Sequence, residues 1–153
     1  MASKLAAAKI AAWSGVRVVI ASAERAEVLR DALAGSPGVG TVVKPRRERL
    51  AARKLWIAFA LAPVGTVVVD RGAKEALMDK GVSLLPAGVR EVRGAFVPGD
   101  AVELIGPDGE VFAKGLARHS AKALAEWAGR RTSELPAEVP KEVVHRDDLV
   151  ILP

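Results

Sequence analysis

The apolar residues in the first 43 residues alternate between helical spacing and continuous runs. This pattern predicts helices over residues 2–14 and 24–33 and strands over residues 16–21 and 40–43. Helix and strand in alternation are typical of an α/β layer, and a continuous apolar strand such as residues 16–21 usually belongs to a parallel sheet covered on both faces. Two strands cannot form such a sheet, so we expect neighbouring strands to be missing from this region.

The two predicted helices each have an apolar face. Val28 and Leu29 are expected to point inward from the second helix, and Gly35 and Gly38 lie in the turn that follows it. The residues of the first helix that can share one face are Leu5, Ala8, Ala12 and Trp13.

After Gly65 the pattern changes to short strands separated by turn residues. Pro107-Asp108-Gly109 is typical of a hairpin turn, and helices are predicted over residues 73–80 and 120–128, the second with Ser120 as its N-cap. Many short strands with two short helices fit a small mixed β-barrel. The strands are predicted over residues 66–70, 88–92, 101–105, 111–116 and 149–152.

The composition of the 153 residues favours a folded protein and excludes several kinds of site. Half of the residues are hydrophobic and 27% are charged, which is typical of a globular core. There is no cysteine, and the two histidines are far apart, so we expect no disulfide and no metal site. No apolar run is long enough to span a membrane and no signal peptide is evident, so a cytoplasmic protein is expected.

The net charge of +5 is unevenly distributed along the chain. Residues 1–54 hold 11 Lys/Arg against 4 Asp/Glu, whereas residues 55–153 hold 12 against 14. A basic domain is typical of nucleic-acid binding, and here the basic excess lies in the first part of the chain. One interpretation of residues 44–54 is a solvated linker or short helix, and the other is an interaction patch for nucleic acid or an acidic partner. The cations of this basic segment are Lys44, Arg46, Arg47, Arg49, Arg53 and Lys54.

Six segments in order along the chain resemble glutamate 5-kinase, an amino acid kinase domain followed by a PUA domain. The resemblance implies an α+β protein overall, with residues 1–50 as a partial α/β remnant at the C-terminal end of the kinase domain. Residues 51–64 would be a linker and residues 65–153 a small mixed β-barrel PUA domain. The segments are Gly40-Thr41, Arg53 to Ile57, Val69 to Ala73, Ser83 to Val89, Gly94-Ala95-Phe96 and His145 to Asp148.

The family implies ATP-dependent, Mg²⁺-dependent phosphorylation of the L-glutamate side chain, the first step of proline biosynthesis. Met1-Ala2-Ser3-Lys4 resembles the end of the family's nucleotide loop, Gly-Gly-Met-x-x-Lys, and the resemblance places Lys4 against ATP phosphates. A helix N-terminus with a lysine suits a phosphate group. The family's catalytic aspartate and glutamate pocket have no counterpart here, so no residue is assigned a catalytic role. We expect the isolated chain to be inactive and to hold no ATP or Mg²⁺.

The PUA resemblance implies a candidate RNA surface around the first helix of that domain, the following turn and the final strand. The alternative interpretation is that the glycines serve turn geometry and the charges are ordinary surface residues. We expect weak RNA binding, given the net charge of −2 in residues 55–153. His119 and His145 are interpreted as structural residues because no nucleophile accompanies them. The RNA candidates are Lys74, Lys80, Leu85, Gly88, Arg90, His145 and Arg146.

The sequence is compatible with three different functions. The first is the C-terminal part of glutamate 5-kinase, with the PUA domain as a regulatory, oligomer-supporting or RNA-binding appendage. The second is a free-standing RNA-binding PUA protein, with the first 54 residues as a basic arm. The third is a structural interaction module. The α/β pattern favours the first over the second, and the uncovered strand at residues 16–21 suggests association with another copy.

Overall fold

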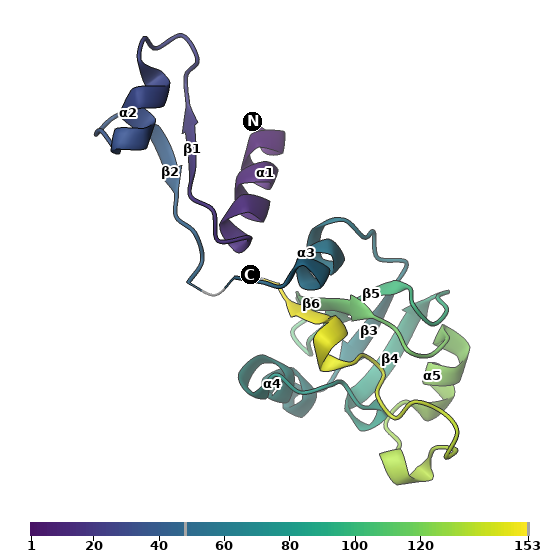
Figure 1. Ribbon diagram of the computed structural model, residues 1–153. Helices are drawn as coiled ribbons and strands as arrows, with labels where there is room; N and C mark the ends of the chain where they lie inside the picture. The colour runs from purple at the N-terminus through teal and green to yellow at the C-terminus, as the bar shows by residue number, and fades with distance from the viewer. Residues whose placement is uncertain (48, 153) are drawn as a thin grey trace. The chain divides into compact units, whose positions relative to one another are not determined.

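The computed structural model describes residues 1–47 and 49–152 (Figure 1). The chain divides into two compact units, the first comprising Met1–Leu55 and the second beginning at Trp56. Helix α3, Ala52–Phe59, runs across the boundary, in the segment where a linker was expected. None of the described helices is both long and apolar enough to cross a membrane.

Unit 1 opens with helix α1, Ala2–Trp13, which confirms the first predicted helix. Ala8, Ala12 and Trp13 are buried, whereas Leu5, predicted on the same face, is 53% exposed. The chain leaves the helix through Gly15, which has a φ of +79°. This left-handed conformation suits glycine because it has no Cβ.

The two strands of unit 1, β1 (Val18–Ala21) and β2 (Gly40–Val43), form a two-stranded antiparallel sheet. The prediction that the first strand belongs to a parallel sheet is therefore wrong for the described residues. Helix α2, Val28–Ala34, connects the strands, and the turns on either side of it bring β2 back alongside β1 in the opposite direction (Figure 1).

Helix α2 begins later than the sequence predicts. Glu27 adopts a left-handed conformation, with a φ of +58°, directly before the first helical turn. Leu29 is 77% exposed, so the prediction that it points inward is also wrong. The helix buries no residue completely.

Unit 2 contains a five-stranded mixed sheet in the order β4-β3-β5-β6-β7. β3 runs parallel to β5, and the other neighbouring pairs are antiparallel. All five predicted strands are present, which confirms the α+β class, but no ladder among the described strands joins β4 to β7, so the sheet is open where a barrel was expected. The strands are β3 (Gly65–Val69), β4 (Val89–Gly94), β5 (Ala101–Ile105), β6 (Val111–Leu116) and β7 (Leu149–Ile151).

Both predicted helices of unit 2 are confirmed, and each begins at a side-chain cap. Asp70 Oδ1 accepts the Ala73 N–H at 2.8 Å at the start of α4, Arg71–Lys80. Ser120 Oγ accepts the Ala123 N–H at the start of α5, Ala121–Trp127. Such caps satisfy N–H groups that have no partner within the helix. Three short 3₁₀ helices complete the unit: η1 (Pro86–Gly88), η2 (Thr132–Glu134) and η3 (Arg146–Asp148).

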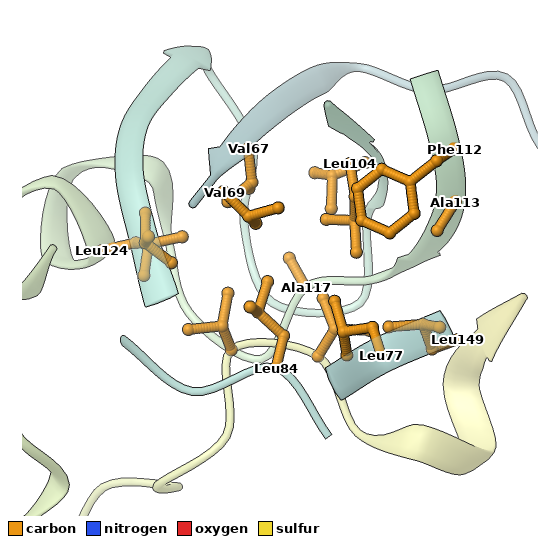
Figure 2. Close-up of a cluster of buried hydrophobic side chains, with 14 of the residues drawn as sticks. Val67, Val69, Leu77, Leu84, Leu104, Phe112, Ala113, Ala117, Leu124 and Leu149 are labelled. Carbon is orange, nitrogen blue, oxygen red and sulfur yellow. The ribbon is translucent and has the colours of Figure 1, made fainter. Parts of the chain in front are cut away.

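The core of unit 2 is a cluster of aliphatic side chains and two phenylalanines beneath the sheet. Figure 2 shows Val67, Val69 and Leu104 from the central strands facing Leu77 of α4 and Leu84. Because the core takes side chains from α4 and from the turn after it, the packing fixes the position of that turn. The same turn forms one wall of an apolar groove.

Candidate functional site

An apolar groove of about 320 Å³ lies in unit 2 between helix α4 and the turn that follows it. Seven of its lining residues are Ala, Val or Leu, and Asp70 supplies the acidic group. The turn itself, residues 82–88, ends in the 3₁₀ helix η1. The residues that line the groove are Asp70, Ala73, Ala76, Leu77, Val82, Ser83, Leu84, Leu85, Ala87 and Gly88.

Gly88 allows the turn to approach α4 closely. A Cβ at this position would lie 2.5 Å from Ala73 Cβ, which is closer than real contacts allow. The Asp70 N–H donates to the Gly88 carbonyl at 2.9 Å, so the backbone holds the same approach. Gly88 therefore serves packing here, in agreement with the structural interpretation of this glycine.

The segment before the final strand lies alongside the same turn. Ser83 Oγ accepts the Arg146 N–H at 3.0 Å, and Leu84 forms a backbone bridge to Val144. His145 Nδ1 accepts the Asp147 N–H at 3.3 Å, and this caps η3. Residues 60 or more positions apart thus meet at one place in the fold, through a backbone bridge and a hydrogen bond to a serine side chain.

Four of the seven RNA candidates gather around this groove. Leu85 and Gly88 line it, Arg146 is tied to its wall through Ser83, and the Arg90 guanidinium lies 3.0 Å from Asp70 Oδ2. His145 directly precedes Arg146 in the same segment.

Lys74 lies apart from the groove. Its ammonium group pairs with Asp108 and lies 5.5 Å from the centre of the Phe112 ring. These contacts place it at a separate hollow lined by residues of α4 and of the hairpin turn after β5. The hydrogen bond from Lys74 lowers the pKa of the Asp108 carboxyl below its usual value. Lys80 is the last residue of α4 and is exposed.

Two polar residues of unit 2 are buried, which the sequence did not predict. Lys114 on β6 is 7% exposed, and its ammonium group donates to the carbonyls of Ala58 and Leu61 at the end of α3. Burial lowers the pKa of Lys114, and the charge of Glu103 opposes that shift. The alternation of β6 gives no signal for this arrangement, because a lysine between apolar residues predicts an exposed position.

His119 is 5% exposed and lies edge-on to Trp127, with ring centroids 5.0 Å apart. Its Nε2 has no hydrogen-bond partner among the described residues. Burial lowers the pKa of His119. Hydrogen bonds with the backbone of Glu142 and Pro140 oppose this shift. The residue directly precedes the Ser120 cap of α5, in agreement with a structural role.

The second candidate site is the N-terminus of α1. Met1 occupies the N-cap position and forms no side-chain hydrogen bond to the helix, and the first turn contains no acidic residue. Lys4 is exposed in this turn. A helix N-terminus with an adjacent cation and no competing carboxylate has the chemistry of an anion site.

The basic segment, residues 44–54, adjoins the other end of α1. The Arg46 N–H donates to the Ala12 carbonyl at 2.9 Å, and the Arg46 guanidinium lies 4.2 Å from the centre of the Trp13 ring. The Leu50 N–H donates to the Trp13 carbonyl at 3.2 Å. Since a helical residue rises about 1.5 Å, Lys4 and this segment are separated by more than 10 Å along the helix.

Comparison with known proteins finds a family model that matches unit 2 and curated relatives that align with nearly the whole chain. Residues 65–139 match the PUA domain. The chain is 46% identical over 153 residues to the glutamate 5-kinase of Rhodococcus jostii (strain RHA1), covering 99% of this chain and 40% of that enzyme. It is 43% identical over 156 residues to the glutamate 5-kinase of Synechococcus sp. (strain JA-3-3Ab), again covering 99% of this chain and 42% of that enzyme.

A crystal structure of a PUA domain from Aeropyrum pernix K1, in complex with tartrate, is 26% identical, with a TM-score of 0.43; the match covers 69% of this chain and 51% of that one. These two comparisons confirm the resemblance predicted from the sequence: residues 65–139 match the PUA domain, and the chain is similar to a C-terminal part of glutamate 5-kinase. It spans about 40% of the length of these curated relatives.

Proposed function

We propose that this chain acts as the C-terminal part of a glutamate 5-kinase, which transfers a phosphoryl group from ATP to the side-chain carboxylate of L-glutamate. One observation supports this most directly: the similarity to the kinases covers 99% of the chain, unit 1 included. The PUA match begins only at residue 65, so a PUA domain alone does not account for the similarity of residues 1–64. We assign residues 1–50 to the kinase domain, 51–64 to the connection and 65–153 to the PUA domain.

In this proposal the N-terminus of α1 contributes to the ATP site. Met1, Ala2 and Ser3 supply the start of the helix, whose positive dipole end faces an anion, and Lys4 supplies a cation in the same turn. Bound ATP with Mg²⁺ supplies the phosphoryl group. The role of the chain is to hold the phosphates in place and to offset their charge while the glutamate carboxylate attacks.

The test is a fusion of this chain with the part of the R. jostii enzyme that precedes the aligned stretch. The fusion is expected to release ADP in the presence of L-glutamate, ATP and Mg²⁺, and the preceding part alone is expected to release much less. A fusion that folds, as judged by circular dichroism and gel filtration, but shows no glutamate-dependent turnover would contradict the proposal.

We further propose weak, salt-sensitive RNA binding as a second property. The observation behind it is the gathering of Leu85, Gly88, Arg90 and Arg146 around one groove, together with the basic segment of unit 1. Each phosphate contact releases counterions, so the affinity should fall steeply as salt rises. We expect the basic segment to dominate, because the cations near the groove are few and Arg90 is already paired with Asp70.

Two sets of substitutions in the full chain separate these contributions. Changing Arg46, Arg47 and Arg49 to Ala should reduce the slope of log affinity against log salt by about 2 for single-stranded RNA. Changing Arg90 and Arg146 to Ala should have a smaller effect. If the second set abolishes binding and the first does not, the groove is the principal RNA site.

A further inference from the structure

Trp56 on helix α3 is an exposed aromatic residue in a chain that has few aromatic residues. The 153 residues include three Trp, three Phe and no Tyr. Two of the tryptophans already have partners: Arg46 lies over the Trp13 ring, and His119 lies edge-on to Trp127. Among the aromatic side chains that the structure describes, Trp56 alone is exposed, at 49%. Its ring is therefore available to a partner.

The helix that carries Trp56 is fixed to unit 2 through its buried side. Ile57, the next residue, is completely buried. The Lys114 ammonium group donates to the carbonyls of Ala58 and Leu61, which holds the end of the helix against the sheet. A ring on a fixed helix has little freedom left to lose when a partner binds, and this favours binding.

The exposed side of α3 also carries positive charge. Arg53 precedes Trp56 by three positions, so the two side chains lie on one side of the helix, and both are exposed. The basic segment, residues 44–54, includes the start of this helix and holds six cations and one acidic residue, Glu48. An aromatic ring among cations is typical of surfaces that bind single-stranded nucleic acid, because the cations contact phosphates and a base stacks on the ring.

Two other anionic partners fit this helix less well. A helix that lies on a membrane needs an apolar face turned outward, whereas Ile57 of α3 is buried within unit 2. A nucleic-acid duplex keeps its bases stacked inside, so it offers phosphates but no free base to Trp56. The ring and the charges together therefore favour a single strand.

We propose that Trp56 is a base-stacking residue for single-stranded RNA, with the cations of the basic segment contacting the neighbouring phosphates. This inference rests on the RNA binding proposed above. It places the stacked base outside the PUA match, which begins at residue 65, and on a different element from the groove lined by Leu85 and Gly88. Stacking depends on the ring and phosphate contact depends on charge, so salt separates the two contributions.

The experiment measures binding of the full chain to an oligouridylate of about 12 nucleotides, with Trp56→Ala, Trp56→Phe and Met78→Ala as variants. Met78→Ala is the matched control, because Met78 is 50% exposed on helix α4 of the same unit. Trp56→Ala should weaken binding about tenfold, whereas Trp56→Phe, which keeps a ring, and Met78→Ala should each stay within about threefold of the wild type. Trp56→Ala should leave the slope of log affinity against log salt unchanged, because it removes no charge.

Tryptophan fluorescence gives a second readout that holds even if Trp56→Ala fails to fold. The oligouridylate should quench the emission of the wild-type chain, and an RNA duplex of the same length should quench it much less. Trp56→Phe should lose most of the quenching, because Trp13 is buried and Trp127 is packed against His119. Unchanged affinity in a folded Trp56→Ala variant, or equal quenching by the duplex, would overturn the inference.

Two further results would overturn the inference by giving the Trp56 ring another partner. One is a blue shift of the Trp56 emission on vesicles of phosphatidylcholine and phosphatidylglycerol that displace the RNA, which would indicate a lipid surface. The other is a blue-shifted emission that RNA does not quench in the fusion with the R. jostii part, because that part would then cover the ring.

The stacking role and the proposed RNA binding fail in different ways. If the wild-type chain binds no RNA even at low salt, the RNA binding is refuted and the stacking role with it. If the wild-type chain binds the oligouridylate with the expected salt dependence, but Trp56→Ala binds as tightly as Met78→Ala, the stacking role alone is refuted.

Discussion

Replacing the buried lysine of β6 by methionine tests how helix α3 is attached to the sheet. Lys114 donates to the carbonyls of Ala58, at 3.2 Å, and Leu61, and its cross-strand partner on β5 is Glu103. Lys114→Met keeps the length and most of the volume of the side chain but removes both donors. The variant should therefore release the end of α3 without opening a large cavity.

The expected loss in free energy of unfolding is the difference between two opposing contributions. A hydrogen bond from a charged donor contributes about 1.5–3 kcal/mol, and two are lost. Part of this loss is offset because the variant no longer buries an ammonium group. We expect a net decrease of about 2 kcal/mol in the free energy of unfolding, which lowers the melting temperature of a domain of about 100 residues by roughly 8–16 °C.

The pH dependence gives a second, independent signature. Burial lowers the pKa of Lys114 in the folded state below that in the unfolded chain, so the unfolded chain binds more protons between the two pKa values. Stability therefore rises with pH through that window. Methionine does not titrate, so the difference in free energy of unfolding between the wild type and the variant should grow as the pH rises toward the ordinary lysine pKa of about 10.4.

Urea unfolding followed by tryptophan fluorescence is a suitable assay, because Trp56 lies on α3 and Trp127 on α5. Lys141→Met, at an exposed lysine of the same unit, is the control. The assignment of Lys114 as the anchor of α3 is refuted if Lys114→Met is as stable as Lys141→Met. It is also refuted if the loss in free energy of unfolding caused by Lys114→Met does not change with pH.

Three further predictions concern activity, packing and acid stability. The isolated chain should release no ADP in a glutamate-dependent manner, and turnover that Lys4→Ala abolishes would contradict this. Gly88→Ala should destabilise unit 2 by about 1–3 kcal/mol because its Cβ would clash with α4. Gly72→Ala, in the first turn of α4, places a Cβ at an ordinary 3.6 Å from Asp70 Oδ1 and should stabilise unit 2 by about 0.4–1 kcal/mol. Calorimetry of both variants checks this pair of predictions. Burial lowers the pKa of His119 from 6.5, so the neutral form is favoured in the folded state. The free energy of unfolding should therefore fall as the pH drops below that value, and His119→Phe should remove this part of the acid sensitivity. An unchanged pH profile in His119→Phe would count against this prediction.

Much of unit 2 could be predicted because its turns are encoded locally. The strands Ala101–Ile105 and Val111–Leu116 have the predicted bounds, since Pro107 and Gly109 fix the hairpin between them. Ser120 likewise marks the start of α5. In such segments the hydrophobic pattern and the turn residues agree, which leaves few alternatives.

Unit 1 was harder to predict because its interior depends on partners distant in sequence. The apolar run before Ala21 does not specify the direction of its neighbour, and the antiparallel pairing is set by the path through α2. Leu29 fits an inward position on pattern alone, yet no described element covers it. The pattern indicates which residues prefer burial, and the partner decides whether they are buried.

The candidate site was predictable only in part. Leu85 and Gly88 lie on the turn that the sequence indicated. Lys74, in contrast, forms an ion pair with Asp108, 34 residues away. Arg146 reaches the groove through Ser83, 63 residues away. These pairings depend on the tertiary fold, and neither spacing nor composition encodes them.

The most direct test of the central claim is the kinetics of the fusion with Lys4→Ala, compared with Lys9→Ala. Both lysines are exposed on α1, but only Lys4 lies in its first turn. If Lys4 neutralises phosphate charge, its loss should lower kcat/KM for ATP by about 100-fold, and Lys9→Ala should leave it within about twofold, the range of ordinary surface substitutions. Equal kinetics for the two variants would contradict the claim that this chain contributes to the ATP site of a glutamate kinase.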